Sequence, residues 1–264
     1  MPRNFSRKTR VLLECLAEAI ANTASTLASP SIGRFESGGH DDEPLERKLF
    51  RLAERGVITF PEPADPRIVR LTELGQALAA GDHPPSARWA RPWDGHWRMV
   101  LFDVAEHERP VRDRLRDTLH AAKLGYLQGS VWISPDPLDP LRDAIRAMTA
   151  NPEALLFFEG RPSAGESDAA LVAGAWNFPR LAEAHRECLT LLHHAPAESD
   201  PPDRWRTWLL QEHEAWQRAL ALDPLLPDAL LPQNYLGKEV HALRRTHLRR
   251  ALRFGYGLSP LPAK

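Results

Sequence analysis

Arginines recur at helical spacing in the N-terminal part of the chain, and their charge is the first candidate for chemistry. Arg47, Arg51 and Arg55 stand at positions i, i+4 and i+8, and Lys48 lies beside them. Because an α-helix has about 3.6 residues per turn, the three arginines share one face. A face of guanidinium groups attracts phosphate, so this segment is a candidate contact with the backbone and bases of DNA.

A solvated helix surface is the alternative interpretation of the same stripe. Glu46 and Glu54 lie among the basic residues, and residues 1–82 as a whole are not net basic. Arg67 and Arg70 add positive charge further along, in a run that is rich in β-formers. Residue types and spacing alone leave both interpretations open.

Motifs of metal and nucleotide chemistry do not occur in the sequence. The two cysteines, Cys15 and Cys188, are far apart and have no CxxC partner, and no two histidines have HExxH or HxxxH spacing. Neither GxxxxGK[ST] nor GxGxxG occurs. We therefore expect no bound metal, no cofactor and no catalytic role.

The elements that must position the arginine stripe can be read from hydrophobic periodicity. Apolar residues at helical spacing predict a first helix from about Ser6 to Asn22, and the segment 23–29 fits a short second helix. Residues 29–43 show no regular pattern. Asp42 is a good N-cap for the next helix, which carries the stripe and should end at Gly56.

Two β-rich runs follow this helix and complete the first predicted domain. The runs 57–60 and 67–71 are separated by a proline-containing turn, and Thr72 then caps a short helix that ends near Gly81. Helices followed by a two-stranded ribbon are typical of a winged helix, which we assign to residues 1–82.

The rest of the chain predicts a linker and two further domains. Residues 83–93 contain three prolines and read as a linker. Residues 94–160 follow the order β-α-β-β-α-β, which is that of a ferredoxin-like domain. Residues 161–264 read as helices separated by proline turns. The fold class is therefore α+β.

Composition sets limits on location and partners. The chain has 264 residues with 34 basic and 35 acidic side chains, so whole-surface attraction to phosphate is excluded. No run of about 18 uncharged apolar residues occurs, and no secretory signal precedes the first helix. We expect a cytoplasmic protein that has no membrane partner.

Three blocks in the middle of the chain and one near its end resemble the PaaX family of transcriptional regulators. They are the residues 93–104, 112–116, 129–135 and 223–232. The resemblance implies a homodimeric repressor of a catabolic operon, with a winged helix on operator double-stranded DNA. It also implies a central domain that forms the dimer and is similar to the small CRISPR-adaptation nuclease. The implied effector that releases the repressor is an acyl-CoA such as phenylacetyl-CoA.

The most basic segment of the chain lies near its C-terminus and becomes a candidate effector site through this resemblance. Arg244, Arg245 and Arg249 stand in it, with Glu239 as the single acid. Their charge would attract the phosphates of coenzyme A or of DNA that flanks the operator. The alternative is a solvated face whose side-chain stems pack over neighbouring leucines.

Two alternatives from other functional classes stay open. Asp103 ends the first strand of the central domain, where the similar nuclease has a metal-binding aspartate, so a metal-dependent nuclease is the first alternative. A single carboxylate is a poor Mg²⁺ site, which argues against it. The second alternative is an interaction protein whose irregular segment 29–43 no longer permits operator recognition.

Overall fold

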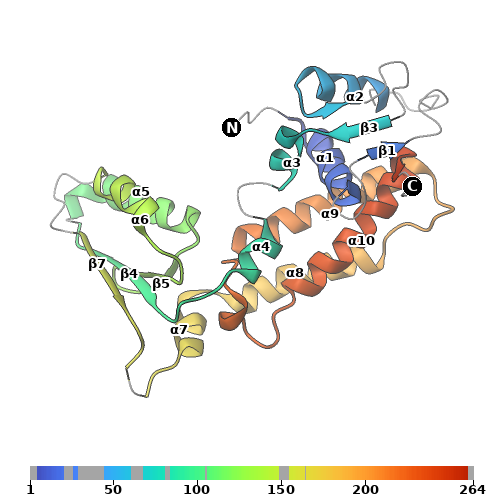
Figure 1. Cartoon of the computed structure of the whole chain (residues 1–264). Coiled ribbons are helices and arrows are strands. Elements are labelled where there is room, and N and C mark those ends of the chain that lie inside the picture. Colours follow the sequence, from blue (N-terminus) through green and yellow to red (C-terminus); the bar gives the residue numbers. More distant parts are fainter. Residues whose placement is uncertain are drawn as a thin grey trace. The chain divides into compact units, whose positions relative to one another are not determined.

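Two units, each built from separate stretches of sequence, make up the chain in the computed structural model (Figure 1). The structure describes residues 5–20, 26–28, 45–60, 68–80, 84–104, 106–148, 155–163 and 165–260. The first unit comprises residues 1–84, 184–218 and 236–264, and the second comprises residues 85–183 and 219–235. The segment 161–264, predicted as one helical domain, is thus divided between the two units.

Three helices of the first unit come from the N-terminal segment: α1 (Arg7–Ile20), α2 (Leu45–Glu54) and α3 (Glu73–Ala80). At the start of α1, the Ser6 hydroxyl oxygen accepts a hydrogen bond from the N–H of Thr9 at 3.3 Å. Leu49 and Leu52 of α2 are each 1% exposed. Gly56, with a φ of 68°, ends this helix in the left-handed conformation that glycine tolerates, as the sequence predicted.

Four short antiparallel strands form the sheet of the first unit, in the order β2-β3-β1-β8. They are β1 (Thr26–Ala28), β2 (Ile58–Thr59), β3 (Ile68–Leu71) and β8 (Ser259–Pro260). β2 and β3 form the predicted ribbon. The short helix predicted over 23–29 is wrong where the structure describes it, because pairing with β3 overrides a weak local preference. The segment 29–43 lies outside the described residues.

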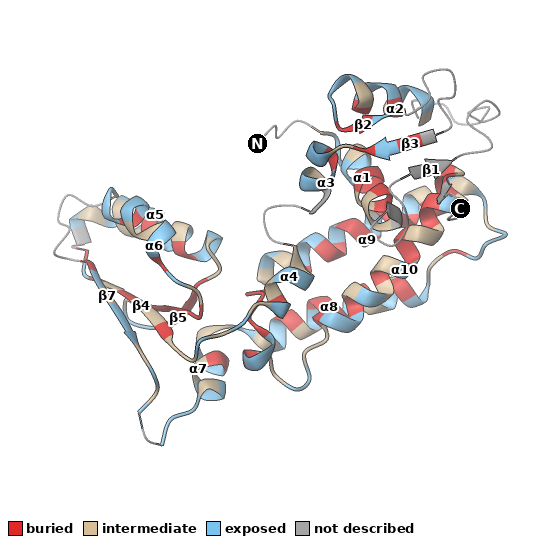
Figure 2. Cartoon of the chain, in the orientation of Figure 1, coloured by how far each residue is buried: buried red, intermediate tan, exposed pale blue. Residues whose placement is uncertain are grey.

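Three long helices follow in the C-terminal part of the chain: α8 (Phe178–His193), α9 (Pro202–Leu222) and α10 (Gly237–Tyr256). Each has a buried and an exposed side (Figure 2). No helix in the described part of the chain combines the length and apolar character that crossing a bilayer requires. α10 ends at Gly257, and β8 then pairs with β1. The C-terminal helix and the N-terminal sheet therefore belong to one fold unit.

A four-stranded antiparallel sheet in the order β5-β6-β4-β7 organises the second unit. Its elements are β4 (Trp97–Phe102), η1 (Glu106–Glu108), α5 (Arg109–Ala121), β5 (Gly125–Gln128), β6 (Val131–Ser134), α6 (Asp139–Arg146) and β7 (Leu155–Gly160). α5 and α6 pack on one face of the sheet (Figure 1). The core there includes Val100, Phe102, Leu115, Leu119, Trp132 and Ile145.

The other face of this sheet is partly covered by α7 (Asp168–Ala175) and by a segment that contains η3 (Asp228–Leu230). This second core contains Trp97, Ile133, Val172, Leu226 and Leu230. The Trp97 indole N–H donates to Asp168 Oδ1 at 2.8 Å. Gly125 allows the close approach of β5, since a Cβ there would lie 2.6 Å from the Trp176 ring. The block 223–232 thus serves to pack against the sheet.

The linker predicted over 83–93 contains a helix, α4 (Pro85–Ala90). Trp89 on this helix is 4% exposed, and its ring centroid lies 5.9 Å from that of Tyr235. Proline is tolerated in the first turn of a helix, so Pro85 begins α4 instead of preventing it. The linker prediction is corrected accordingly: residues 85–93 form part of the second unit.

Candidate nucleic-acid interface

α2 presents the arginine stripe to solvent. Arg47, Arg51 and Arg55 are exposed and Lys48 is half-buried, while Leu49 and Leu52 on the opposite face of α2 are buried. The Arg55 guanidinium lies over the Phe5 ring, 4.9 Å from its centroid. The structure therefore brings together all four basic residues predicted on this helix, on a surface that a ligand can reach.

The β-ribbon adds an exposed arginine beside α2. Arg70 lies on β3 opposite Thr59 of β2, and its side chain is exposed. Arg67, the other predicted ribbon contact, lies outside the described residues. The described part of the ribbon thus carries one of the two predicted positive charges.

Thr72 ties the ribbon to the end of α2. Its hydroxyl oxygen lies 2.6 Å from the carbonyl oxygen of Gly56 and 3.0 Å from that of Val57, and it accepts from the N–H of Gly75 at 3.1 Å. A Cβ at Gly75 would lie 2.1 Å from the Val57 carbonyl oxygen, so only glycine permits this approach. These contacts fix the positions of α2, β3 and α3 relative to one another.

Phe50 is a surface residue of α2 that sequence reasoning missed. Its side chain is 46% exposed, and its ring centroid lies 5.3 Å from that of Phe60, which follows β2. A signal was present in the sequence: Phe50 is an apolar residue that falls outside the buried spacing of Leu45, Leu49 and Leu52.

The predicted effector arginines lie on α10, and the first of them is buried in an ion-pair cluster. Arg244 Nε donates to Glu212 Oε1 at 2.7 Å, and its Nη2 donates to Glu14 Oε2 at 2.5 Å. His213 Nδ1 lies 3.2 Å from the same Glu14 oxygen. The Arg244 guanidinium also lies 5.3 Å from the Trp216 ring centroid. We call these five residues the Arg244 cluster; they join α1, α9 and α10.

The two remaining effector candidates, Arg245 and Arg249, are both half-buried. Arg245 Nε donates to Glu18 Oε1 at 2.6 Å, which gives a second ion pair between α10 and α1. Arg249 is half-buried further along α10. A ligand phosphate at Arg244 or Arg245 would therefore have to compete with carboxylates of α1.

The Arg244 cluster moves the pKa values of its two carboxyl groups in opposite directions. Burial raises the pKa of Glu14, but the charge of Arg244 and the hydrogen bond from His213 outweigh it and bring the value from 4.5 to about 2. Burial raises the pKa of Glu212, and Arg244 offsets this only in part. Burial lowers the pKa of Arg244, but Glu212 and Glu14 together raise it above its ordinary value.

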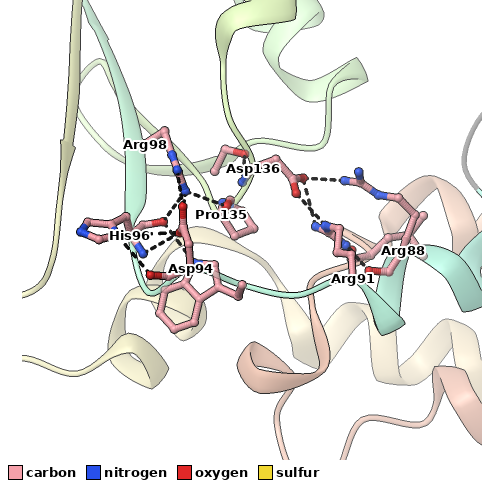
Figure 3. Close-up of polar contacts among 10 residues, drawn as sticks. Arg88, Arg91, Asp94, His96, Arg98, Pro135 and Asp136 are labelled. Carbon is pink, nitrogen blue, oxygen red and sulfur yellow. Dashed lines mark hydrogen bonds and ion pairs between the residues drawn. The ribbon is translucent and has the colours of Figure 1, made fainter.

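A second polar network lies in the block 93–104 of the second unit (Figure 3). Asp94 accepts from the N–H of His96 at 3.0 Å and from the Arg98 guanidinium at 2.8 and 2.5 Å. The hydrogen bond from Arg98 lowers the pKa of Asp94 far below its ordinary value. Arg98 also donates to the Pro135 carbonyl oxygen at 3.2 Å. The start of β4 is thereby attached to the end of β6.

Asp136 is the centre of the neighbouring contacts (Figure 3). Arg91 binds its two carboxylate oxygens at 2.6 and 3.0 Å, and Arg88 donates to it at 2.6 Å. Arg91 also donates to the carbonyl oxygen of Leu225 at 2.5 Å. These bonds attach α4 to the turn after β6 and to the segment 223–232, so the polar side chains here hold the domain together.

Among the described residues, one group of three potential metal ligands occurs, formed by Asp94, His96 and Glu159. Arg98 lies 2.5 Å from Asp94 and 3.3 Å from Glu159, so a guanidinium already balances these carboxylates. Asp103, the carboxylate of the nuclease alternative, is exposed after the other end of β4. It belongs to no such group in the described part of the chain.

Comparisons with known proteins match the middle and the C-terminal part of the chain to family models. Residues 90–172 match the family model described as the PaaX protein central Cas2-like domain, and residues 176–255 match that of the PaaX-like protein C-terminal domain. The transcriptional repressor PaaX of Escherichia coli K12 is 23% identical over 220 residues, which cover 79% of this chain and 69% of that protein.

A solved structure shares the fold. The uncharacterized protein Rv0674 from Mycobacterium tuberculosis superposes with a TM-score of 0.56 at 21% sequence identity, over 91% of this chain and 95% of that chain. This likeness concerns the fold alone. Because the two family models together match more than half of its residues, the chain belongs to the PaaX family.

Proposed function

We propose that the protein is a transcriptional repressor that binds operator double-stranded DNA through α2 and the β2-β3 ribbon. The proposal rests mainly on the exposed stripe of Arg47, Arg51 and Arg55. Exposed Arg70 lies nearby on β3, which Thr72 attaches to the end of α2. The element order α1-β1-α2-β2-β3 and the neighbouring strands β2-β3-β1 fit a winged helix, with α2 as its recognition helix. The named relative is a transcriptional repressor, which supports this assignment.

A homodimer is part of the proposal, with the second unit as its dimerisation domain. The strand order β5-β6-β4-β7 fits a ferredoxin-like sheet, whose edges are β5 and β7. The edge strand β5 has a register irregularity and packs against α7, whereas β7 pairs regularly along six residues. Leu156 and Phe158 on β7 are 52% and 51% exposed. An apolar edge strand of this kind favours pairing with a second copy.

An acyl-CoA such as phenylacetyl-CoA is the effector in this proposal, and the controlled genes form a catabolic operon. Family membership supports this effector, and the positive charge of α10 suits the phosphates of coenzyme A. Arg244 and Arg245 contact carboxylates of α1, and Arg249 lies half-buried further along α10. An effector that engaged these arginines would loosen α10 from α1, the helix before the winged-helix sheet. The proposed setting is the cytoplasm, and no catalytic step is required.

Selection of DNA from a random-sequence pool tests the proposal. Wild-type protein should enrich one sequence, and footprinting should confirm that it is protected. Arg47→Glu/Arg51→Glu should abolish binding, because the repulsion between carboxylates and phosphates replaces attraction. The matched control is Arg180→Glu/Arg186→Glu, a double charge reversal at exposed positions of α8, which should bind as wild type does. Unchanged affinity of a folded Arg47→Glu/Arg51→Glu protein would contradict the assignment of α2.

A further inference from the structure

An exposed aromatic ring stands among the arginines of α2. Phe50 is 46% exposed although both helical neighbours on the buried face, Leu49 and Leu52, are at 1%. At 3.6 residues per turn, Phe50 lies about 60° around the helix from Arg47, on the solvent side. The proposed DNA-binding face of α2 thus contains an apolar side chain beside Arg47, on the side away from Arg51.

The orientation of the Phe50 ring is set by the ribbon. The Phe60 ring contacts it with an interplanar angle of 53° and a centroid separation of 5.3 Å. Phe60 comes directly after β2, which pairs with β3 and is tied to the end of α2 through Thr72. One side of the Phe50 ring is therefore supported, and the side chain is 46% exposed to solvent.

The neighbours of Phe50 point to a polyanion as the partner. Arg47 and Arg51 of α2 and Arg55, which directly follows α2, are exposed, so positive charge beside the ring complements the phosphates of a DNA groove. The major groove offers one apolar group at a base edge, the 5-methyl group of thymine, and phenylalanine is among the side chains that contact it.

We propose that Phe50 packs against the methyl group of a thymine in the major groove, and that the operator therefore carries a thymine within reach of α2. The inference rests on the proposed function and adds a base-specific contact to it. The arginines supply attraction to phosphate and to guanine edges, and Phe50 supplies discrimination that no charged residue of this helix provides.

Replacement of thymine by deoxyuridine tests this contact, because it removes the methyl group and leaves the base pair intact. The probe is the duplex selected from a random pool by wild-type protein, with one thymine replaced at a time. Wild-type protein should lose about fourfold in affinity at one position of each half-site, the value expected for one buried methyl group. Phe50→Ala should bind the thymine duplex and the deoxyuridine duplex with equal affinity. Phe50→Leu should keep part of the preference for thymine.

Leu74→Ala is the matched control, since Leu74 of α3 is similarly exposed at 44%. This variant should discriminate as wild type does. Thermal unfolding of each variant shows whether it is folded. The deoxyuridine series on wild-type protein tests the thymine contact even if a variant does not fold. If wild-type protein binds its duplex but no deoxyuridine substitution matters, or if Phe50→Ala still discriminates, the inference is overturned while the proposed function stands. Tight binding by Arg47→Glu/Arg51→Glu would overturn the proposed function itself.

Discussion

Two arginine-rich helices, α2 and α10, look alike in sequence and differ in the structure. On α2 the side chains of Arg47 and Arg51 are exposed, whereas the Arg244 side chain on α10 is 8% exposed and bound to two carboxylates. The two helices thus differ in exposure, and acids of α1 and α9 bind the buried arginine of α10. A row of arginines in a sequence can therefore lie on the surface of a fold, as on α2, or be drawn into its interior by acids of neighbouring helices, as Arg244 is on α10.

Burial of Arg244 depends on these counter-ions. Moving a guanidinium out of water is costly unless opposite charges and hydrogen bonds replace its hydration. Glu14 and Glu212 do so, and the Trp216 ring covers part of the guanidinium. The same ionic contacts hold α1 to α10 within the first unit, so α10 is in a position to influence the N-terminal helices and sheet of that unit.

Removing the positive charge of Arg244 should have the largest effect. Arg244→Met keeps much of the side-chain volume but leaves the buried Glu212 without its guanidinium and Glu14 with His213 alone from the Arg244 cluster. We expect the free energy of unfolding to fall by about 3–5 kcal/mol. Urea denaturation at neutral pH measures this loss.

Two controls sharpen this prediction. Arg47→Ala, on the exposed helix α2, should change the free energy of unfolding by no more than about 0.5 kcal/mol. Adding Glu14→Gln and Glu212→Gln to Arg244→Met should recover part of the stability, because no buried charge is then left alone. Equal losses for Arg244→Met and Arg47→Ala would show that the two helices do not differ as described.

The pH dependence of stability should report on Glu14. Its pKa in the folded protein is about 2, below the ordinary value of 4.5. A lowered folded-state pKa means that the ionised carboxylate stabilises the fold above pH 4.5, and that this contribution is lost as the pH falls toward 2. The contribution is about 3 kcal/mol. Glu14→Gln should therefore be destabilised relative to wild type at pH 7, with a gap that narrows below pH 4.5 in urea denaturation.

Glu212 should behave in the opposite way. Burial raises the pKa of Glu212 in the folded protein, so this carboxylate takes up a proton more readily in the folded than in the unfolded chain. Protonation at falling pH removes the cost of burying the charge, so the contribution of Glu212 to stability becomes more favourable. The difference between Glu212→Gln and wild type should thus change with pH in the direction opposite to that of Glu14→Gln. Parallel pH profiles for the two variants would contradict this assignment of charges within the Arg244 cluster.

On α2 the expected effect is smaller and concerns binding instead of folding. If Arg51 reads a guanine, Arg51→Ala should weaken operator binding by about 1–3 kcal/mol and relax specificity at one base pair. Its free energy of unfolding should stay within about 0.5 kcal/mol of wild type. Fluorescence anisotropy on the selected duplex and on its single-base variants measures both affinity and specificity. A uniform loss on all duplexes would make Arg51 a phosphate contact instead.

The local helices and strands could be predicted from the sequence, whereas contacts between segments far apart in the chain could not. The spacing of Leu45, Leu49 and Leu52 predicts α2, and β-rich runs predict the ribbon, because both depend on residue period alone. The pairing of β8 with β1 joins distant segments that carry no local signal. For Arg244 a signal existed: it stands in helical register with Val240 and Leu248, both buried, so its position already belongs to the inner face of α10.

The smallest predicted effect belongs to Arg70 on the β-ribbon, and it separates backbone contacts from base contacts. Arg70 is exposed on β3, beside α2 and not on it. In a winged helix the ribbon lies along the DNA backbone, so Arg70→Ala should weaken binding alike on all sequences. Losing one phosphate contact should lower the slope of log K against log salt concentration by about one, without any change in base preference. The same salt titration on Arg186→Ala, an exposed arginine of α8, should leave the slope unchanged. A wild-type slope for Arg70→Ala would place the ribbon away from the phosphates and leave α2 as the sole DNA contact in the described part of the first unit.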